Sequence, residues 1–126
     1  MPEIRTLLVD DEPDVRLVMR LAIESENDDD LSVVGEAEDG QQALSKMDDL
    51  DPSVVVIDLR MPHLDGLTTA SRMLDARPDL AIILCSAHCD RELQYEARAL
   101  GVAACVSKTD LVEIPTLIKQ VVRVPS

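Results

Sequence analysis

The sequence predicts an α/β protein built on a single doubly wound, parallel β-sheet that is covered by helices on both faces. Two observations point to this class: five mainly apolar runs alternate with five stretches of helical periodicity, and most of the apolar runs are nearly continuous. Continuous apolar runs are typical of parallel strands that are buried on both faces. Strict alternation with right-handed crossovers then gives the doubly wound arrangement.

Five strands are expected from these runs. Four of them, at residues 4–9, 54–57, 80–85 and 102–106, are mostly apolar and short enough to be single strands. The fifth, at residues 31–37, mixes valine with polar residues, so we expect it near an edge of the sheet.

Helices are expected between the strands from apolar residues that recur every three or four positions. Pro13 suits the first turn of the first helix, and Gly101 suits the end of the fourth. Pro115 would clash inside a longer helix, so we expect the last helix to begin near Ile114, after a loop at residues 109–113. The periodic positions are Val15, Val18, Met19 and Ala22 in the first helix, Ala43, Leu44 and Met47 in the second (about 40–47), Leu67, Ala70, Ser71 and Leu74 in the third, Leu93, Ala97 and Leu100 in the fourth (about 91–100), and Ile114, Leu117, Ile118 and Val121 in the fifth.

The composition indicates one globular domain, residues 1–126, without a linker or a second domain. Twelve basic against 25 acidic residues leave a formal net charge of −13, which repels nucleic acid and anionic membranes. The chain alone is therefore a poor candidate for DNA binding. The acidic run at residues 27–30 is expected to be a solvated loop rather than a metal site. Without a signal-peptide pattern or a membrane-length apolar run, the protein is expected to be cytoplasmic.

The three cysteines, Cys85, Cys89 and Cys105, cannot all pair with one another and lack the spacing of a zinc site. We therefore expect reduced thiols, some of them in the core, because cysteine is often simply a buried residue. A redox role for Cys89, which falls in an expected loop, is the alternative.

Polar side chains follow four of the five expected strands, at the point where each strand ends. They are Asp10 and Asp11 after the first strand, Asp58 after the third, Ser86 after the fourth, and Ser107 and Lys108 after the fifth. Ligands of doubly wound sheets bind at the carboxyl ends of the strands, so we expect these side chains to converge. Converging carboxylates repel one another unless a cation is present, and Mg²⁺ prefers oxygen ligands. With a lysine and a hydroxyl added, the set suits a transferring phosphoryl group.

Asp58 is the expected nucleophile of this site. A carboxylate can itself attack phosphorus and form an aspartyl phosphate. Asp10 and Asp11 are adjacent in the chain and suited to hold a metal as a pair. Asp58 stands alone at the end of the buried run VVVI, before a loop that contains proline and glycine. An aspartate pair after a strand can also be a simple helix N-cap. For the whole set to have no function, however, a purely structural explanation would have to be true of every one of these residues at once.

Four segments, VDDEPD, VVVIDLRMPHLDG, ILCSA and VSKTD, resemble the signature segments of response-regulator receiver domains, in the family's order. The resemblance covers essentially the whole chain. It implies the flavodoxin-like (βα)5 fold, with strand order 2-1-3-4-5. It also implies a phosphoacceptor that regulates other proteins rather than a turnover enzyme, with a sensor histidine kinase as its partner.

The resemblance further implies a metal site. Mg²⁺, or Mn²⁺ in its place, would be ligated by Asp11, Asp58 and the backbone carbonyl of Arg60. Asp10 would contribute through a water molecule.

The same resemblance assigns the groups around the phosphoryl group. Asp58 would accept it from the kinase's phosphohistidine, Ser86 would hydrogen-bond its oxygens, and Lys108 would pair with Asp58 before phosphorylation and with the phosphoryl group afterwards. Arg60 and His88 lie two residues after Asp58 and Ser86, at positions that flank the phosphoryl group in the family. We therefore predict that they set how long the phosphate lasts.

One position departs from the family pattern. Receivers usually carry tyrosine or phenylalanine three residues before the lysine, and this chain has Cys105 there, so no ring can swing between inside and outside. The signal is then expected to leave through the loop after Ser86 and the helix that follows. The surface of the fourth helix, fifth strand and fifth helix is the expected site for a homodimer or for an output module.

The output itself is left open by the sequence. The segments EAEDG and SKTD resemble regulators of the NarL/FixJ kind, which carry a C-terminal helix-turn-helix, and this predicts transcription regulation through an attached DNA-binding domain. A stand-alone receiver that acts by protein contact is the alternative.

Two other classes of protein are weaker alternatives. A phosphatase of the haloacid-dehalogenase kind usually has Asp-x-Asp after its first strand, where this chain has Asp-Asp-Glu. A flavin-binding electron carrier needs a loop that cradles phosphate, and the acidic segment DDEPD stands at that place.

Overall fold

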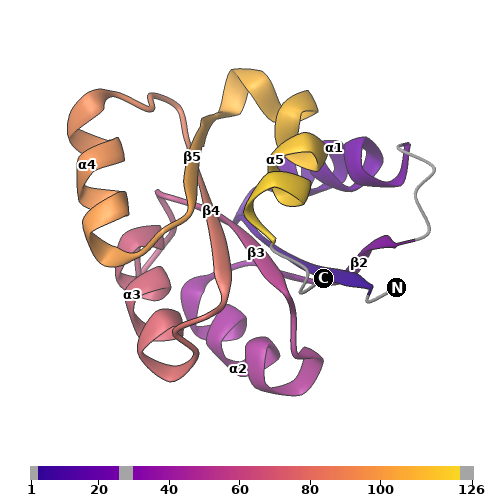
Figure 1. Cartoon of the computed structure of the whole chain (residues 1–126), viewed down its shortest axis with the longest axis horizontal. Helices are drawn as coiled ribbons and strands as arrows, with labels where there is room; N and C mark the ends of the chain where they lie inside the picture. Colours follow the sequence, from indigo (N-terminus) through magenta and orange to yellow (C-terminus); the bar gives the residue numbers. More distant parts are fainter. Residues whose placement is uncertain (1–2, 26–29, 123–126) are drawn as a thin grey trace.

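The computed structural model describes residues 3–25 and 30–122 and contains the predicted sheet (Figure 1). The five strands are parallel and lie in the order β2-β1-β3-β4-β5, which confirms the predicted fold class and strand order. The strands are β1 (Ile4–Val9), β2 (Leu31–Ala37), β3 (Val54–Asp58), β4 (Ala81–Ser86) and β5 (Ala104–Ser107). The helices are α1 (Pro13–Glu24), α2 (Gly40–Leu50), α3 (Gly66–Ala76), α4 (Arg91–Leu100), the 3₁₀ helix η1 (Lys108–Glu113) and α5 (Ile114–Val121). Most of the acidic run expected as a loop, residues 27–29, lies outside the described ranges.

Helices cover both faces of the sheet, with α2, α3 and α4 on one face and α1 and α5 on the other (Figure 1). Successive side chains of a strand point to opposite faces, so each central strand supplies both cores. In β3, Val55 and Ile57 pack with α2, α3 and α4, whereas Val54 and Val56 pack with α1 and α5. All four side chains are fully buried, as the unbroken apolar run predicted.

β2 lies at an edge of the sheet, as its mixed composition predicted. Leu31 and Ala37 at its two ends are buried, and the residues between them are half-buried. The register with β1 shifts between Thr6 and Leu7, which pair with Val33 and Gly35. The sheet is therefore regular at its centre and irregular at this edge.

Two of the predicted inward-facing residues are exposed. Val18 of α1 is 48% exposed and Leu100 of α4 is 42% exposed. On α1 the buried residues are Met19 and Ile23, and on α4 the only buried residue is Ala97. Both helices thus present narrower faces to the sheet than their periodicity suggested.

The loop expected before the last helix is a 3₁₀ helix instead. α5 begins at Ile114 as predicted, but the preceding residues are wound into η1. The Ser107 side chain accepts a hydrogen bond from the Thr109 backbone, which caps the start of η1, and Leu111 is buried. Capping and one apolar anchor explain why this segment is ordered.

The expectation of reduced thiols is wrong for two of the three cysteines. Cys89 and Cys105 form a disulfide, with their Cα atoms 6.3 Å apart, which is normal for such a bond. β4 and β5 are neighbouring strands, and this brings the loop after β4 close to β5 although the two cysteines are 16 residues apart. Cys85 is free and fully buried, as expected for a core cysteine.

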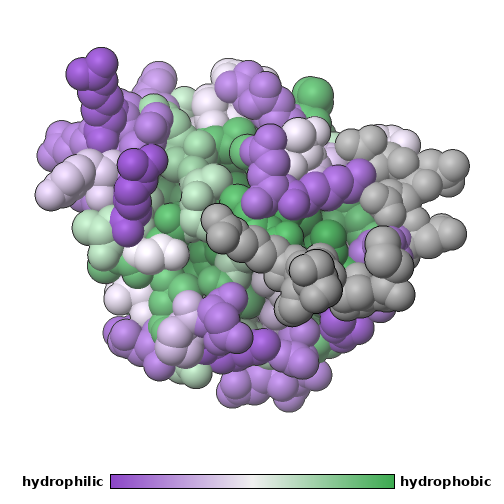
Figure 2. All heavy atoms as spheres, in the orientation of Figure 1, coloured by the Kyte–Doolittle hydropathy of each residue, from purple (hydrophilic) through white to green (hydrophobic). Residues whose placement is uncertain are grey.

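Figure 2 shows polar side chains over the helices at the periphery of one face and apolar side chains over its middle, where strands lie in Figure 1. Among the described residues, no helix has both the length and the apolar character to cross a membrane.

Glu36 of β2 ties α1 to the edge of the sheet. Its carboxylate accepts hydrogen bonds from Arg16 Nε at 2.9 Å and from Arg20 Nη2 at 2.7 Å. Arg16 also donates to the backbone carbonyl of Asp10, at the end of β1. Partial burial opposes the ionisation of Glu36, but the hydrogen bonds from Arg20 and Arg16 outweigh it and lower its pKa.

Replacing Glu36 by glutamine should reduce the free energy of unfolding near neutral pH by about 1 kcal/mol, because the pair is partly screened by solvent. The pKa of Glu36 is lowered from 4.5 on folding, so its contribution is complete above 4.5 and is lost as the pH falls through the folded value. Urea unfolding at a series of pH values from neutral into acid follows this loss. Glu24→Gln is the control, because Glu24 pairs with Arg20 across one turn of α1 and is 54% exposed. Equal losses of unfolding free energy in the two variants would contradict the inference that Glu36 ties α1 to the edge of the sheet.

Candidate functional site

The polar residues predicted from the strand ends do converge at one edge of the sheet. Asp10 follows β1, Asp58 ends β3, Ser86 ends β4, and Lys108 follows β5. β1, β3, β4 and β5 are successive neighbours in the sheet, and parallel strands all end at the same edge. The order of the strands therefore accounts for the meeting of residues that are far apart in the chain.

Lys108 is the central cation of the site. Its Nζ atom lies 3.1 Å from Asp58 Oδ1, 3.5 Å from Asp10 Oδ2 and 3.7 Å from Glu12 Oε1. Partial burial lowers the pKa of Lys108, but the hydrogen bond to Asp58 and the charge of Asp10 outweigh this, and the pKa is raised. The lysine is therefore held in its charged form between two buried carboxylates.

Asp10 is fully buried, and only one of its two carboxylate oxygens has a hydrogen-bond partner. Its Oδ1 accepts a hydrogen bond from the Glu12 backbone at 2.8 Å, whereas Oδ2 is buried without a hydrogen-bond partner. The 3.5 Å to Lys108 is long for a hydrogen bond but short enough for attraction between charges. Burial raises the pKa of Asp10 to about 6, opposed by the Glu12 backbone and reinforced by the charge of Asp58.

Asp58 is nearly as buried as Asp10 but better paired. Burial raises its pKa, and the contact with Lys108 and a hydrogen bond from the Arg60 backbone oppose that rise. The charge of Asp11 adds to the rise. The charge at the end of β3 is thus stabilised mainly by a single lysine, and any further cation would stabilise it more.

A cluster of acidic side chains beside Lys108 fits a divalent cation. Carboxylate oxygens of Asp10, Asp11 and Glu12 lie within 4.8 Å of one another. The set offers oxygen ligands only, as a hard ion such as Mg²⁺ prefers. Asp10 also has a buried oxygen, Oδ2, without a hydrogen-bond partner. Glu12 was not among the residues predicted for the metal. The signal for it was its place directly after the aspartate pair.

The loop after β3 is packed tightly against the backbone of Asp58. A Cβ atom on Gly66 would lie 2.2 Å from the Asp58 carbonyl oxygen, so only glycine fits there. Gly66 donates a backbone hydrogen bond to Leu59, and Leu59 donates one to Cys85 of β4, both at 2.8 Å. These bonds fix the backbone around Arg60, whose carbonyl is a predicted metal ligand.

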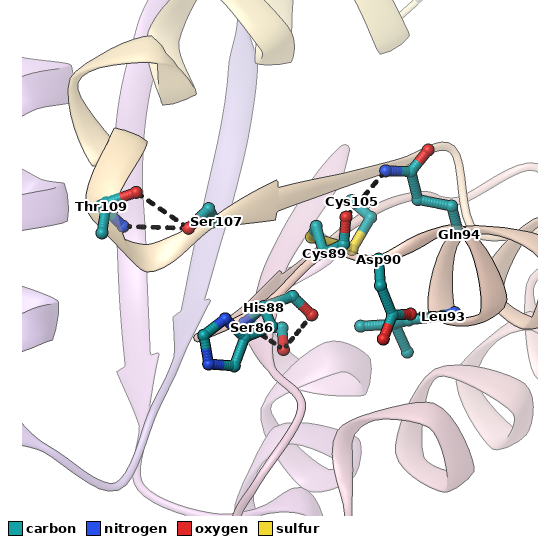
Figure 3. Close-up of a disulfide and its surroundings, with 9 residues drawn as sticks. All are labelled: Ser86, His88, Cys89, Asp90, Leu93, Gln94, Cys105, Ser107 and Thr109. Atoms are coloured by element: carbon teal, nitrogen blue, oxygen red, sulfur yellow. Dashed lines mark hydrogen bonds between the residues drawn. A yellow bond between two sulfur atoms is a disulfide. The ribbon is translucent and has the colours of Figure 1, made fainter.

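Ser86 occupies the predicted place, but its hydroxyl is engaged elsewhere (Figure 3). Ser86 Oγ donates to the backbone carbonyl of His88 at 3.1 Å and accepts from the His88 backbone N–H at 3.2 Å. Ser86 therefore caps the loop that follows β4. The side chains of Arg60 and His88 are both exposed, and both residues line an open cleft of about 550 Å³ that includes Ser86 and Ala87.

The fold and the convergence of charges at its carboxyl edge are those of a signal-receiving α/β domain. Residues 6–120 match the family model of the response regulator receiver domain. The chain therefore belongs to the receiver-domain family of two-component response regulators. This membership sets aside the phosphatase and flavin-carrier alternatives.

The chain is similar to proteins of several kinds. The chain is 39% identical over 104 residues to a protein-glutamate methylesterase/protein-glutamine glutaminase of Syntrophomonas wolfei, covering 82% of this chain and 29% of that protein. It is 34% identical over 84 residues to the chemotaxis protein CheY of Listeria monocytogenes, covering 67% of this chain and 68% of that protein. The receiver domain of NarL from Mycobacterium tuberculosis superposes with a TM-score of 0.81 at 29% identity, covering 94% of this chain and 98% of that chain. The chain thus spans less than a third of the methylesterase that it matches.

Replacing Asp10 by asparagine should stabilise the protein near neutral pH in the presence of a chelator, by about 2 kcal/mol. An acid whose pKa is raised by folding destabilises the fold once it is ionised. The penalty is therefore absent below the ordinary pKa of 3.8 and complete above about 6.

Urea unfolding at neutral pH and at about pH 4 should show the gain at neutral pH and little of it in acid. Asp11→Asn is the matched control, because Asp11 is exposed, and it should change stability little. A loss of stability in Asp10→Asn at neutral pH would contradict the inference that the buried, ionised Asp10 carboxylate destabilises the fold.

Proposed function

We propose that Asp58 is the phosphoacceptor of this receiver and that Lys108 and Ser86 contact the phosphoryl group. The observation that carries the proposal is the 3.1 Å contact between Lys108 Nζ and a buried carboxylate at the end of β3. The second buried carboxylate, Asp10, makes a purely structural ion pair an incomplete explanation. One lysine does not balance two buried carboxylates, and a fold with no use for the excess charge would be more stable without it.

In the proposed reaction, a carboxylate oxygen of Asp58 attacks the phosphorus of a phosphohistidine on a sensor histidine kinase. The new P–O bond forms as the P–N bond breaks. The electron pair of the P–N bond stays on that ring nitrogen, and the imidazole, which carries a proton on its other nitrogen, leaves as a neutral base. Lys108 faces the same carboxylate and compensates the negative charge on the phosphoryl oxygens as they approach. The product is an aspartyl phosphate at the end of β3.

The metal that this chemistry uses would be held by the acidic cluster. Asp11, Asp58 and the Arg60 carbonyl would ligate Mg²⁺ or Mn²⁺, with Asp10 contributing through water and Glu12 adjacent to it. When bound, the divalent ion neutralises charge on the phosphoryl oxygens and offsets the repulsion between the carboxylates.

Signalling would follow from the charge that the phosphoryl group adds. An aspartyl phosphate brings about −1.5 to −2 charges into a site that already holds excess negative charge. Lys108 would turn to the phosphoryl oxygens, and the Ser86 hydroxyl would leave the His88 carbonyl to donate to one of them. Both moves displace the ends of β4 and β5, so the surface of α4, β5 and α5 would shift its population toward an active form.

We further propose that residues 1–126 are one receiver domain of a cytoplasmic regulator. The segments EAEDG and SKTD, which resemble regulators with a C-terminal helix-turn-helix, support a DNA-binding output domain. The formal charge of −13 means that DNA would be reached only through such a domain. The surface of α4, β5 and α5 would mediate a homodimer or the contact with that domain.

The methylesterase relative makes an enzymatic output domain the alternative. In either case the receiver domain itself would act as a phosphoacceptor rather than as a turnover enzyme.

Incubation with acetyl phosphate and Mg²⁺, followed by intact-mass measurement, should show one phosphate-sized gain that is absent in Asp58→Asn. Asp79→Asn is the control, because Asp79 is exposed, precedes the start of β4 at the edge of the sheet opposite the strand ends, and should leave the gain unchanged. Removing Mg²⁺ with a chelator should abolish the gain. A folded wild-type protein that gains no mass with Mg²⁺ present would contradict the proposal.

Arg60→Ala and His88→Ala should each change the rate of autodephosphorylation, because both residues line the cleft beside Ser86. A change of severalfold, about 2- to 10-fold, is expected from altered access and electrostatics at this rim. The decay of the phosphorylated mass after acetyl phosphate is removed measures it. Wild-type decay in both variants would rule out the predicted role in phosphate lifetime.

A further inference from the structure

We propose that the Cys89–Cys105 disulfide is a reversible redox site that restrains the receiver switch and is opened by a dithiol. In the oxidised form it would hold the loop between β4 and α4 against β5. In the reduced form that loop would be free to rearrange around a phosphoryl group. The inference rests on the proposed phosphorylation of Asp58 and adds a second input to the same site.

The disulfide lies between the two moving groups of the proposed switch. Cys89 comes three residues after Ser86, and Cys105 comes three residues before Lys108. Leu84 and Cys105 are partners in the pairing of β4 with β5, and Ser86 pairs with Ser107 two residues further along. The disulfide therefore links the loop that follows β4 directly to the neighbouring strand β5 (Figure 3).

The restrained loop is the one that engages the Ser86 hydroxyl. Both hydrogen bonds of the Ser86 hydroxyl are made to the backbone of His88, directly before Cys89. To reach a phosphoryl oxygen, the hydroxyl must give up the His88 carbonyl, and the loop must adjust with it. With the sheet holding one end of the segment at Ser86 and the disulfide holding the other at Cys89, little adjustment is available.

The same bond anchors a helix with little buried surface, α4. Ala97 is the only buried residue of α4, so few apolar contacts hold this helix to the sheet. Its start depends on the Asp90 side chain, which accepts from the Leu93 backbone at 2.8 Å, and on Gln94, whose side chain donates to the Cys89 carbonyl at 3.0 Å. Elements with few buried contacts open at low free energy, and a covalent tie next to the N-cap suppresses such opening.

Both sulfur-bearing residues are partly exposed, so an external thiol can reach them. In the exchange, a thiolate of a dithiol attacks one sulfur, the Cys89–Cys105 bond breaks, and the released thiolate takes up a proton. The second thiol of the reagent then displaces the remaining protein sulfur, which leaves two protein thiols and an oxidised, cyclic reagent. Exchange with a disulfide reagent reverses the reaction. In a reducing compartment, such as the cytoplasm proposed above, disulfides are commonly transient and regulatory.

The experiment compares the oxidised and the dithiothreitol-reduced wild-type protein. Denaturing alkylation and intact mass should count one reactive cysteine before reduction and three after it. Each state is then treated with acetyl phosphate and Mg²⁺, and the phosphorylated fraction is followed by mass. Hydrogen exchange of residues 87–100 is measured in parallel without acetyl phosphate. The variants are Cys89→Ser with Cys105→Ser, which cannot form the bond, and Cys85→Ala, which keeps it.

Reduction should speed both phosphorylation and exchange of residues 87–100 by about fivefold or more, the lower end of coupling between sites. The double serine variant should behave as the reduced protein with or without dithiothreitol, and Cys85→Ala should respond as wild type does. Three reactive cysteines in the oxidised protein, or equal rates in the two redox states, would overturn the inference. If neither state gains phosphate, the proposed function fails, and the exchange of residues 87–100 alone then decides whether the disulfide restrains the loop.

Discussion

The site depends on one electrostatic constraint: two buried carboxylates face a single lysine. Asp10 and Asp58 meet because β1 and β3 are neighbours, and Lys108 joins them because β5 ends at the same edge of the sheet. The apolar runs that bury these strands also remove their terminal carboxylates from water, and this raises both pKa values. The hydrophobic core therefore creates the excess of negative charge that a metal ion and a phosphoryl group would relieve.

The fold and most of the site could be predicted from the sequence because both follow from strand ends. An unbroken apolar run marks a buried parallel strand, and the polar residue after it, such as Asp58 or Lys108, must then lie at the carboxyl edge. Glu12 lies in the same acidic cluster but was missed. Its place directly after the aspartate pair was a signal for it, and the folded loop adds that its carboxylate lies near Lys108. Val18 was misplaced because helical periodicity does not tell how wide a face the sheet will cover.

The disulfide could not be predicted for a different reason. Cysteine spacing along a chain says little about a pair that is joined across neighbouring strands, and the expected reduced state followed from the expected compartment. The same bond gives a structural account of the missing aromatic residue. Where a ring would move in other receivers, Cys105 is tied to the loop that carries the Ser86 hydrogen bonds. The departure from the family pattern and the departure from the expected thiols therefore have one origin.

The burial of the free cysteine, Cys85, provides a way to detect whether the protein has unfolded. Cys85 is fully buried among the residues that pack with α1 and α5, whereas Cys105 packs on the opposite face of the sheet. Burial also raises the pKa of the Cys85 thiol to about 12, which keeps it protonated and unreactive. A disulfide that includes Cys85 can thus form only in a chain whose core has opened. Finding one in a peptide map would be a covalent record that the molecule had once unfolded.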